Sequence, residues 1–137
     1  MPKLTATQKL CRKKTEKKVR LESDFAGIRA GSTMFVATPM IVDAYIRAIP
    51  AGEHRTVPGM RNELARRNRC DASCPVSTAI FTRMSAEAAI EQMAEGRDAS
   101  EVAPFWRILR PTDKIALRLA IDPDWIAMQR KLEGIQG

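Results

Sequence analysis

The chain is poor in the residues on which most catalytic and metal sites depend. Its 137 residues include one histidine, His54, and three cysteines, Cys11, Cys70 and Cys74. His54 stands in the loop sequence AGEHRT with no nucleophile beside it, and the C-x3-C pair has no second pair to complete a metal site. No GxGxxG or GxxxxGK stretch is present, so glycine-rich phosphate loops are excluded. We therefore expect no metal and no cofactor.

Long apolar runs are also missing. No run approaches the roughly 20 apolar residues of a membrane span, and the charged N-terminus is not followed by the apolar core of a secretory signal. An odd number of cysteines is typical of reduced thiols. We expect a cytoplasmic, monomeric protein with one folded domain and no membrane association.

The net charge of +7 comes from one end of the chain. Residues 1–20 hold eight of the 23 basic residues and one of the 16 acidic ones, so the rest carries fifteen of each. We expect residues 1–24 to form a flexible basic arm, with a short helix near 11–19, and residues 25–137 to form the domain. The arm either binds the phosphates of a polyanion without reading sequence or is simply a solvated tail. The candidate phosphate-binding residues are Lys9, Arg12, Lys13, Lys14, Lys17 and Lys18.

Three helices are predicted from strong start signals. Thr38-Pro39, Thr56-Val57-Pro58 and Asp122-Pro123 each place a capping residue before a proline in the first turn. Apolar residues follow each start at helical spacing. We expect the inward-facing residues to be Val42, Tyr45, Ile46 and Ile49, then Met60, Leu64 and Ala65, and lastly Trp125, Met128 and Leu132.

A further helix is expected to begin after Ser73, with an apolar face of Val76, Ala79, Ile80 and Met84. If the helix continued in the same register, Glu87 and Glu91 would fall on this apolar face. We therefore predict that the helix leaves the core or ends near Ser85. Beyond it, PFWRIL and IALRL flank the turn-like RPTDK and predict a β-hairpin. The helices that begin near Thr56 and Ser73 are the second and third along the chain. Together with this hairpin they favour a mainly α fold of the winged helix-turn-helix type.

Cys74 has the one chemical argument for catalysis. It lies at a predicted helix N-terminus, where backbone N–H groups and the helix dipole favour a thiolate. One hypothesis is therefore an enzyme that uses Cys74 for alkyl transfer or redox chemistry. The alternative is a small buried cysteine at a helix junction.

Four stretches, in order, resemble one known family. VDAYIRAIPAGEHRTV, ELARR, PFWRI and QRKLEGI are similar to the C-terminal domain of the O6-alkylguanine-DNA alkyltransferases, over roughly residues 34–135. CPVSTAIF and PFWRI also look like a bacterial branch with Pro-aromatic-Trp-Arg and a Cys-Pro before the recognition helix. The resemblance implies a winged-helix domain that binds double-stranded DNA.

The resemblance also implies that the family reaction is absent. Phe105 stands at the position of the alkyl-acceptor cysteine, Trp106 at that of its histidine, and Glu133 at that of the carboxylate that orients the histidine. Phenylalanine cannot accept an alkyl group. The implied protein binds O6-alkylguanine or other damaged DNA without repairing it and marks it for repair proteins. Its base pocket would comprise Pro104, Phe105, Trp106, Arg107 and Glu133.

Other family positions have also changed. Thr78 stands where the family inserts an arginine into the base stack, and Val57 and Pro58 stand near its nucleotide-rotating tyrosine. Phe81 and Arg83 are the alternatives for filling the stack. The DNA-contacting residues implied are Ser77, Thr78, Phe81, Thr82 and Arg83 on the helix, with Arg110 and Lys114 on the wing.

Two alternatives stay open. The rings of Phe105 and Trp106 either line a base pocket or fill it as core. The whole domain either binds DNA or serves as a protein-interaction module on a winged-helix scaffold, which its neutral folded part and the acidic segment 87–101 favour.

Overall fold

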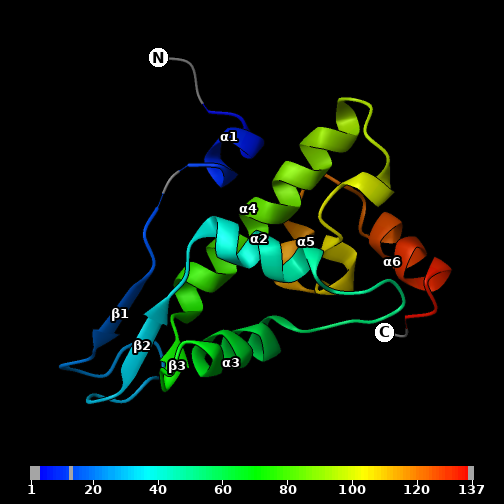
Figure 1. Ribbon diagram of the computed structural model, residues 1–137. Coiled ribbons are helices and arrows are strands. Elements are labelled where there is room, and N and C mark those ends of the chain that lie inside the picture. Colours follow the sequence, from blue (N-terminus) through cyan, green and yellow to red (C-terminus); the bar gives the residue numbers. More distant parts are fainter. Residues whose placement is uncertain (1–3, 13, 136–137) are drawn as a thin grey trace.

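The computed structural model of the chain describes residues 4–12 and 14–135. Within them the chain is about half helical, with six α-helices, two 3-10 turns and a small three-stranded sheet (Figure 1). The elements in order are α1 (Ala6–Leu10), β1 (Lys17–Arg20), β2 (Thr33–Val36), α2 (Pro39–Arg47), α3 (Val57–Arg67), β3 (Ala72–Ser73), α4 (Pro75–Ala94), η1 (Ala99–Glu101), η2 (Phe105–Arg107), α5 (Lys114–Leu117) and α6 (Pro123–Leu132).

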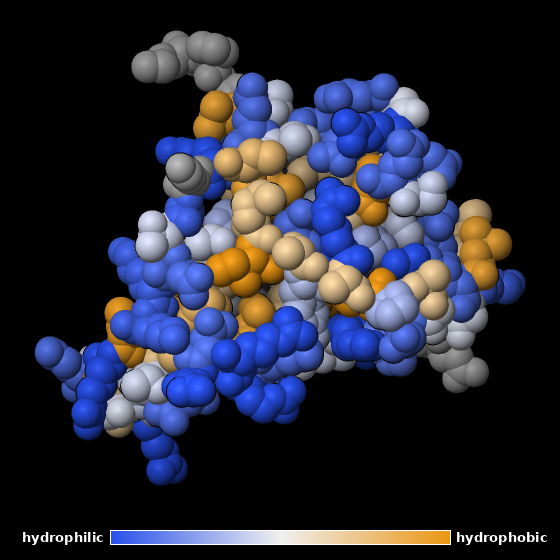
Figure 2. Space-filling view, in the orientation of Figure 1, coloured by the Kyte–Doolittle hydropathy of each residue, from blue (hydrophilic) through white to orange (hydrophobic). Residues whose placement is uncertain are grey.

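The sheet lies at one end of the molecule. Strand β2 is central, antiparallel to β1 and parallel to β3. Both Met34 and Phe35 of β2 are buried, whereas every residue of β1 is exposed. The β1–β2 hairpin extends away from the helices, and hydrophilic side chains dominate that end of the visible face (Figures 1 and 2).

The predicted starts of α2, α3 and α6 are confirmed. The side chains of Thr38, Thr56 and Asp122 accept hydrogen bonds from backbone N–H groups in the first turn, and each helix has proline there. These signals act within four residues, so the sequence predicts them well.

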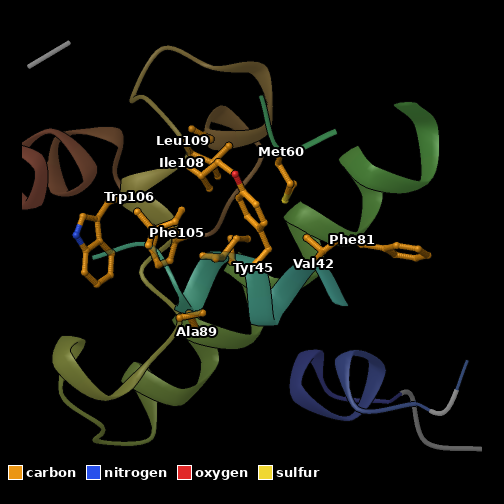
Figure 3. Close-up of a cluster of buried hydrophobic side chains, with 14 of the residues drawn as sticks. Val42, Tyr45, Met60, Phe81, Ala89, Phe105, Trp106, Ile108 and Leu109 are labelled. Carbon is orange, nitrogen blue, oxygen red and sulfur yellow. The ribbon is translucent and has the colours of Figure 1, made fainter. Parts of the chain in front are cut away.

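The core lies where α2, α3, α4 and the segment around η2 meet (Figure 3). The inward faces predicted for α2 and α3 are both confirmed, because all seven side chains are buried. The hydroxyl of Tyr45 donates to Glu63 of α3. Burial, and then this hydrogen bond, raise the pKa of Tyr45 to about 12.

The predicted break of α4 near Ser85 is wrong. The helix continues to Ala94, because Ser85 is buried and its hydroxyl donates to Asp43 Oδ1 at 2.7 Å. The glutamates of its second half have partners as well: Glu87 pairs with Arg83, and Glu91 binds α1. A helix packed from several sides needs no single apolar stripe.

The faces predicted for α4 and α6 are wrong except at Met84 and Trp125, which are partly buried against the core. Val76 and Ile80 are half exposed, and Met128 and Leu132 are exposed. Instead α6 buries Ile126 and Arg130, while α4 buries a different set made largely of small and hydroxylated residues. These short side chains allow close helix packing that a search for large apolar residues overlooks. The buried residues of α4 are Thr78, Phe81, Thr82, Ser85, Ala86, Ala88, Ala89 and Gln92.

The predicted hairpin after residue 104 is wrong too. Its first half forms η2, and Leu109 N–H donates back to Phe105 O. Its second half forms the short helix α5, and Asp113 accepts from the N–H of Arg110 in the turn between them. Local hydrogen bonds thus satisfy the backbone here, and the hairpin of this fold is β1–β2.

The N-terminal arm is folded onto the rest of the chain. Helix α1 lies against α4, where Glu91 accepts hydrogen bonds from the N–H groups of Ala6 and Thr7, and Leu10 is buried. The helix expected near 11–19 is wrong, because β1 occupies part of that range and pairs with β2. The arm therefore completes the sheet and covers part of α4.

Candidate nucleic-acid interface

The aromatic stretch at η2 is part of the core. Phe105 is fully buried and Trp106 is 2% exposed. The ring of Phe105 stacks on Trp125 of α6 with centroids 5.6 Å apart, and Trp106 meets both rings edge to face. Phe105 cannot stack on a nucleobase unless the core opens, so the expectation that its ring lines a base pocket is corrected. Pro104 is buried as well.

Glu133 anchors this stretch to the end of α6. Its carboxylate accepts from Trp106 Nε1 at 2.7 Å, from Arg107 Nε at 2.8 Å and from the N–H of Gly52 at 2.9 Å. Gly52 has φ +84°, a conformation that glycine adopts without strain. Glu133 has no histidine to orient here. Its carboxylate instead has an indole, a guanidinium and a backbone amide as partners.

These hydrogen bonds set the ionisation of Glu133. Burial alone would raise its pKa, but the hydrogen bonds from Arg107, Gly52 and Trp106 outweigh burial and hold the pKa below its ordinary value. Arg107 also donates to the carbonyl of Ile49 at 2.8 Å. The ion pair between Arg107 and Glu133 thus joins η2, the end of α6 and the loop after α2.

An open hollow lies beside Ile108 and Leu109, the two residues that follow η2. It has a volume of about 450 Å³ and is bounded by the start of α3 and the segment leading into α5; we call it the α3–α5 hollow. The N–H of Arg55 donates to Arg107 O at 2.8 Å, which fixes the loop before α3 against η2. Its apolar lining is Val57, Pro58, Ile108, Leu109 and Ile115.

The polar lining of this hollow is mostly cationic. Arg55, Arg110, Lys114 and Arg130 line it together with His54 and a single carboxylate, Asp113. Arg130 is buried and donates to the carbonyl of Trp106 at 2.8 Å; burial lowers its pKa, although nearby Asp113 opposes this. A hollow with apolar walls and several cations suits a flat apolar group that carries negative charge.

A smaller hollow continues this surface between α4 and α5. It has a volume of about 220 Å³, and we call it the α4–α5 hollow. Lys114 and Ile115 line both hollows, so the two adjoin. Its other lining residues are Ala79, Ile80, Arg83 and Arg118.

The predicted DNA-contacting residues of α4 divide into two groups. Thr78 and Thr82 are buried, and their hydroxyls donate to the carbonyls of Cys74 and Thr78 inside the helix. Phe81 is buried, and the ammonium group of Lys14 lies over its ring at 5.3 Å. These three residues are unable to reach a ligand in this structure, so their expected DNA contacts are corrected.

The remaining candidates do reach the surface. Ser77 is partly exposed, and Arg83 lies on the α4–α5 hollow with its Nε 3.4 Å from Glu87 Oε2. Arg110 and Lys114 line the α3–α5 hollow from a turn and from α5 rather than from a wing.

Several residues of this surface are missing from the sequence prediction. His54, Arg55, Arg118, Arg130 and Ile80 were not among the predicted site residues. The stretch IALRLA, which is apolar apart from Arg118, offered the one local signal, and it pointed to a strand. Arg130 and Arg55 meet only through long-range packing, which no local pattern reveals.

Cys74 caps α4 rather than lying open. Its thiol sulfur accepts from the N–H and the hydroxyl of Ser77 at 3.5 and 3.3 Å, and the side chain is buried. Cys74 itself, and not the predicted Ser73, is thus the N-cap, while Ser73 donates to Arg61 O.

This burial predicts slow chemical modification. We expect iodoacetamide near pH 7 to label the exposed Cys11 quickly and Cys74 at least about tenfold more slowly, because reagents reach a buried thiol only after local opening. Mass spectrometry of the native protein over time measures both rates. Equal rates would revive the hypothesis of a reactive Cys74.

The cations of the arm remain at the surface. Lys9, Arg12, Lys14, Lys17 and Lys18 are all exposed, the last two on β1 at the edge of the sheet. Lys13 lies outside the described residues. The arm thus presents these cations from α1, from β1 and from residues next to these two elements.

Neither metal nor membrane features are found in the parts of the chain that the structure describes. Residues 4–12 and 14–135 contain no group of three or more potential metal ligands, and no helix among them has the length and apolarity to cross a membrane. Comparison with models of protein families, with curated proteins and with solved structures gives no match to this chain.

Proposed function

We propose that the protein is a non-catalytic, alkyltransferase-like DNA-binding protein with a helix-turn-helix character. In this proposal α3 and α4 form the helix pair, the exposed face of α4 lies against double-stranded DNA, and the α3–α5 hollow accepts a nucleotide carrying an O6-alkyl or other lesion. The bound protein would mark the lesion for repair proteins.

The adjoining hollows carry this proposal. A nucleotide needs both a surface for its base and cations for its phosphates, and the α3–α5 hollow offers the exposed or partly exposed Val57, Pro58 and Ile115 beside Arg55, Arg110 and Lys114. The hollow begins at Val57 and Pro58, which by the resemblance stand near the family's nucleotide-rotating tyrosine. The exposed part of α4 lies next to it across Lys114 and Ile115.

The chemistry of η2 supports binding without alkyl transfer. Phenylalanine at position 105 has no nucleophilic atom, and its ring is buried against Trp125. Trp106 uses its one N–H to hold Glu133 and has no lone pair with which to activate a thiol. Cys74, the candidate nucleophile predicted from the sequence, is buried as the N-cap of α4.

The cations on and after α5 provide a direct test. We expect the double substitution Lys114→Gln and Arg118→Gln to weaken duplex binding about tenfold at physiological salt and to reduce the log–log salt slope by about 2, because each phosphate contact contributes about 0.9 to the slope. Fluorescence anisotropy of a labelled duplex over a salt series measures both quantities with the full chain.

The matched control changes the same charge elsewhere. Arg66 and Lys131 are exposed and line neither hollow, so Arg66→Gln with Lys131→Gln should leave the slope close to that of the wild type. If both double variants lose affinity equally, binding is a response to net charge alone. If the wild type binds no duplex, the protein-interaction hypothesis replaces this one.

A further inference from the structure

A further hollow lies between the N-terminal arm and α4. It has a volume of about 540 Å³, and we call it the α1–α4 hollow. Sites that hold small molecules in proteins have volumes of roughly 300 to 1,000 Å³, so this hollow is large enough for a small organic ligand. Its lining residues, none of which lines either of the other two hollows, are Leu4, Lys9, Arg12, Lys14 and Met84.

The arm that forms most of this hollow is anchored to α4. Glu91 accepts hydrogen bonds from the backbone N–H groups of Ala6 at 2.9 Å and Thr7 at 3.1 Å. Leu10 is 3% exposed, and α1 packs beside α4 (Figure 1). Lys9 belongs to α1. These contacts therefore hold the cations of α1 and its C-terminal end in place against α4.

Three cations line the hollow without a carboxylate partner. In residues 4–12 and 14–135, every ion pair is formed by other basic residues, so none of Lys9, Arg12 and Lys14 is neutralised by a carboxylate there. The ammonium group of Lys14 lies 5.3 Å from the centroid of the Phe81 ring, a cation–π contact that keeps it beside α4. A group of cations of this kind attracts an anion that carries several charges.

The remaining lining of the hollow is apolar. Leu4 is 42% exposed on the arm, and Met84 of α4 is partly buried against the core. The thioether of methionine is polarisable and packs favourably against aromatic rings. A ligand that fills the hollow would therefore bury an apolar part against Leu4 and Met84 while it places negative charge beside the cations.

These two requirements narrow the class of ligand. An inorganic polyphosphate satisfies the cations but leaves the apolar side chains uncovered. A long-chain carboxylate covers the apolar side chains but brings one negative charge to three cations. A nucleoside triphosphate combines several negative charges with a flat base, and its phosphates are well matched to lysine and arginine.

We propose that the α1–α4 hollow binds a free nucleoside triphosphate, with its phosphates beside Lys9, Arg12 and Lys14 and its base against Leu4 and Met84. The proposal goes beyond the proposed function, because the hollow shares no lining residue with the hollows of the candidate interface. The arm also precedes the stretches that resemble the alkyltransferases, so the site does not depend on that resemblance.

The test is isothermal titration calorimetry of the full chain with ATP, inorganic triphosphate and adenosine, in the presence of EDTA. We expect ATP to bind at least about tenfold more tightly than either of its parts. The double substitution Lys9→Gln and Arg12→Gln should weaken ATP binding at least about tenfold, because two charge-assisted contacts are lost. Both side chains are exposed, so circular dichroism should show the helix content of the wild type.

Two further variants separate a built site from general charge. Lys17→Gln with Lys18→Gln removes the same charge from β1 of the same arm and leaves the lining of the hollow intact, so ATP affinity should stay within about twofold of the wild type. Leu4→Ala removes the exposed part of the apolar wall. It should weaken ATP binding several-fold and leave the affinity for inorganic triphosphate unchanged.

Four results would overturn the proposal. Absence of ATP binding would reject it while leaving DNA binding in place. Equal losses in the two lysine and arginine double variants would show a response to net charge alone. Inorganic triphosphate binding as tightly as ATP would remove the role of the apolar side chains. Displacement of ATP by a DNA duplex, with duplex binding lost in Lys9→Gln with Arg12→Gln, would assign these cations to DNA instead.

Discussion

Replacing Phe105 with alanine is expected to lower the free energy of unfolding by about 3 to 5 kcal/mol. The ring is fully buried and packs against Trp106 and Trp125, so its removal leaves a cavity where three aromatic side chains meet. Urea denaturation followed by tryptophan fluorescence measures the change, since both tryptophans contact the lost ring. A loss this large would put the variant near the limit of stability of an ordinary domain.

Phe25 provides the control for this substitution. It is 42% exposed in the loop between β1 and β2, so Phe25→Ala should cost less than about 1 kcal/mol. A loss below about 1 kcal/mol for Phe105→Ala would mean that the ring is not core and would return it to the role of a pocket wall.

The second large effect is expected at Glu133. Replacing it with alanine removes the acceptor of the Trp106 indole, the Arg107 guanidinium and the Gly52 amide, and leaves a mostly buried guanidinium without its carboxylate. We expect a loss of about 2 to 4 kcal/mol, measured by urea denaturation at pH 7. Glu53→Gln is the control, because its ion pair with Arg55 is exposed and should contribute less than about 1 kcal/mol.

The pH dependence of this loss follows from the lowered pKa of Glu133. A carboxyl group whose pKa is lower in the folded than in the unfolded protein stabilises the fold fully above the unfolded value near 4.5. That contribution disappears as the pH falls through the lower, folded value. The difference in stability between the wild type and Glu133→Ala should therefore be largest at neutral pH and shrink below pH 4.5. A difference that is constant from neutral to acidic pH would show that the ion pair contributes nothing through ionisation.

The two large effects describe one property of the molecule. Phe105 and Trp106 are buried in the core, Glu133 accepts a hydrogen bond from Trp106, and none of the three lines the α3–α5 hollow. Their loss would be felt first in stability.

What the sequence predicts well depends on local signals. Threonine or aspartate before proline places the starts of α2, α3 and α6 correctly, because each cap is completed within a few residues. The inward faces of α2 and α3 follow from helical spacing alone. Exposure of the basic residues of the arm is likewise evident from their charge.

Long-range contacts account for what the sequence does not predict. The spacing of the glutamates of α4 predicts a solvent-exposed face. Glu91 instead accepts hydrogen bonds from the first backbone N–H groups of α1, more than eighty residues away in the chain. IALRL is a short, mostly apolar run of the kind that forms strands, but α4 and the preceding turn hold its first part as α5. The α3–α5 hollow joins residues 54–58 to 108–115 and to Arg130, which no local pattern brings together.

The integration of the arm affects how DNA binding should be measured. Because β1 pairs with β2 and α1 covers α4, a chain that starts after the arm loses an edge of its sheet and exposes part of its core. Charge substitutions such as Lys17→Gln and Lys18→Gln on the exposed strand separate the contribution of the arm without this damage. The full chain is therefore the right material for every binding experiment.

The most direct test of the account is the affinity of the full chain for two duplexes that differ by one O6-methylguanine, compared at physiological salt. We predict about tenfold tighter binding to the duplex with the lesion, the discrimination that one methyl group in an apolar pocket typically provides. This result would mean that the α3–α5 hollow receives a modified nucleotide. Equal affinity for the two duplexes would contradict lesion recognition.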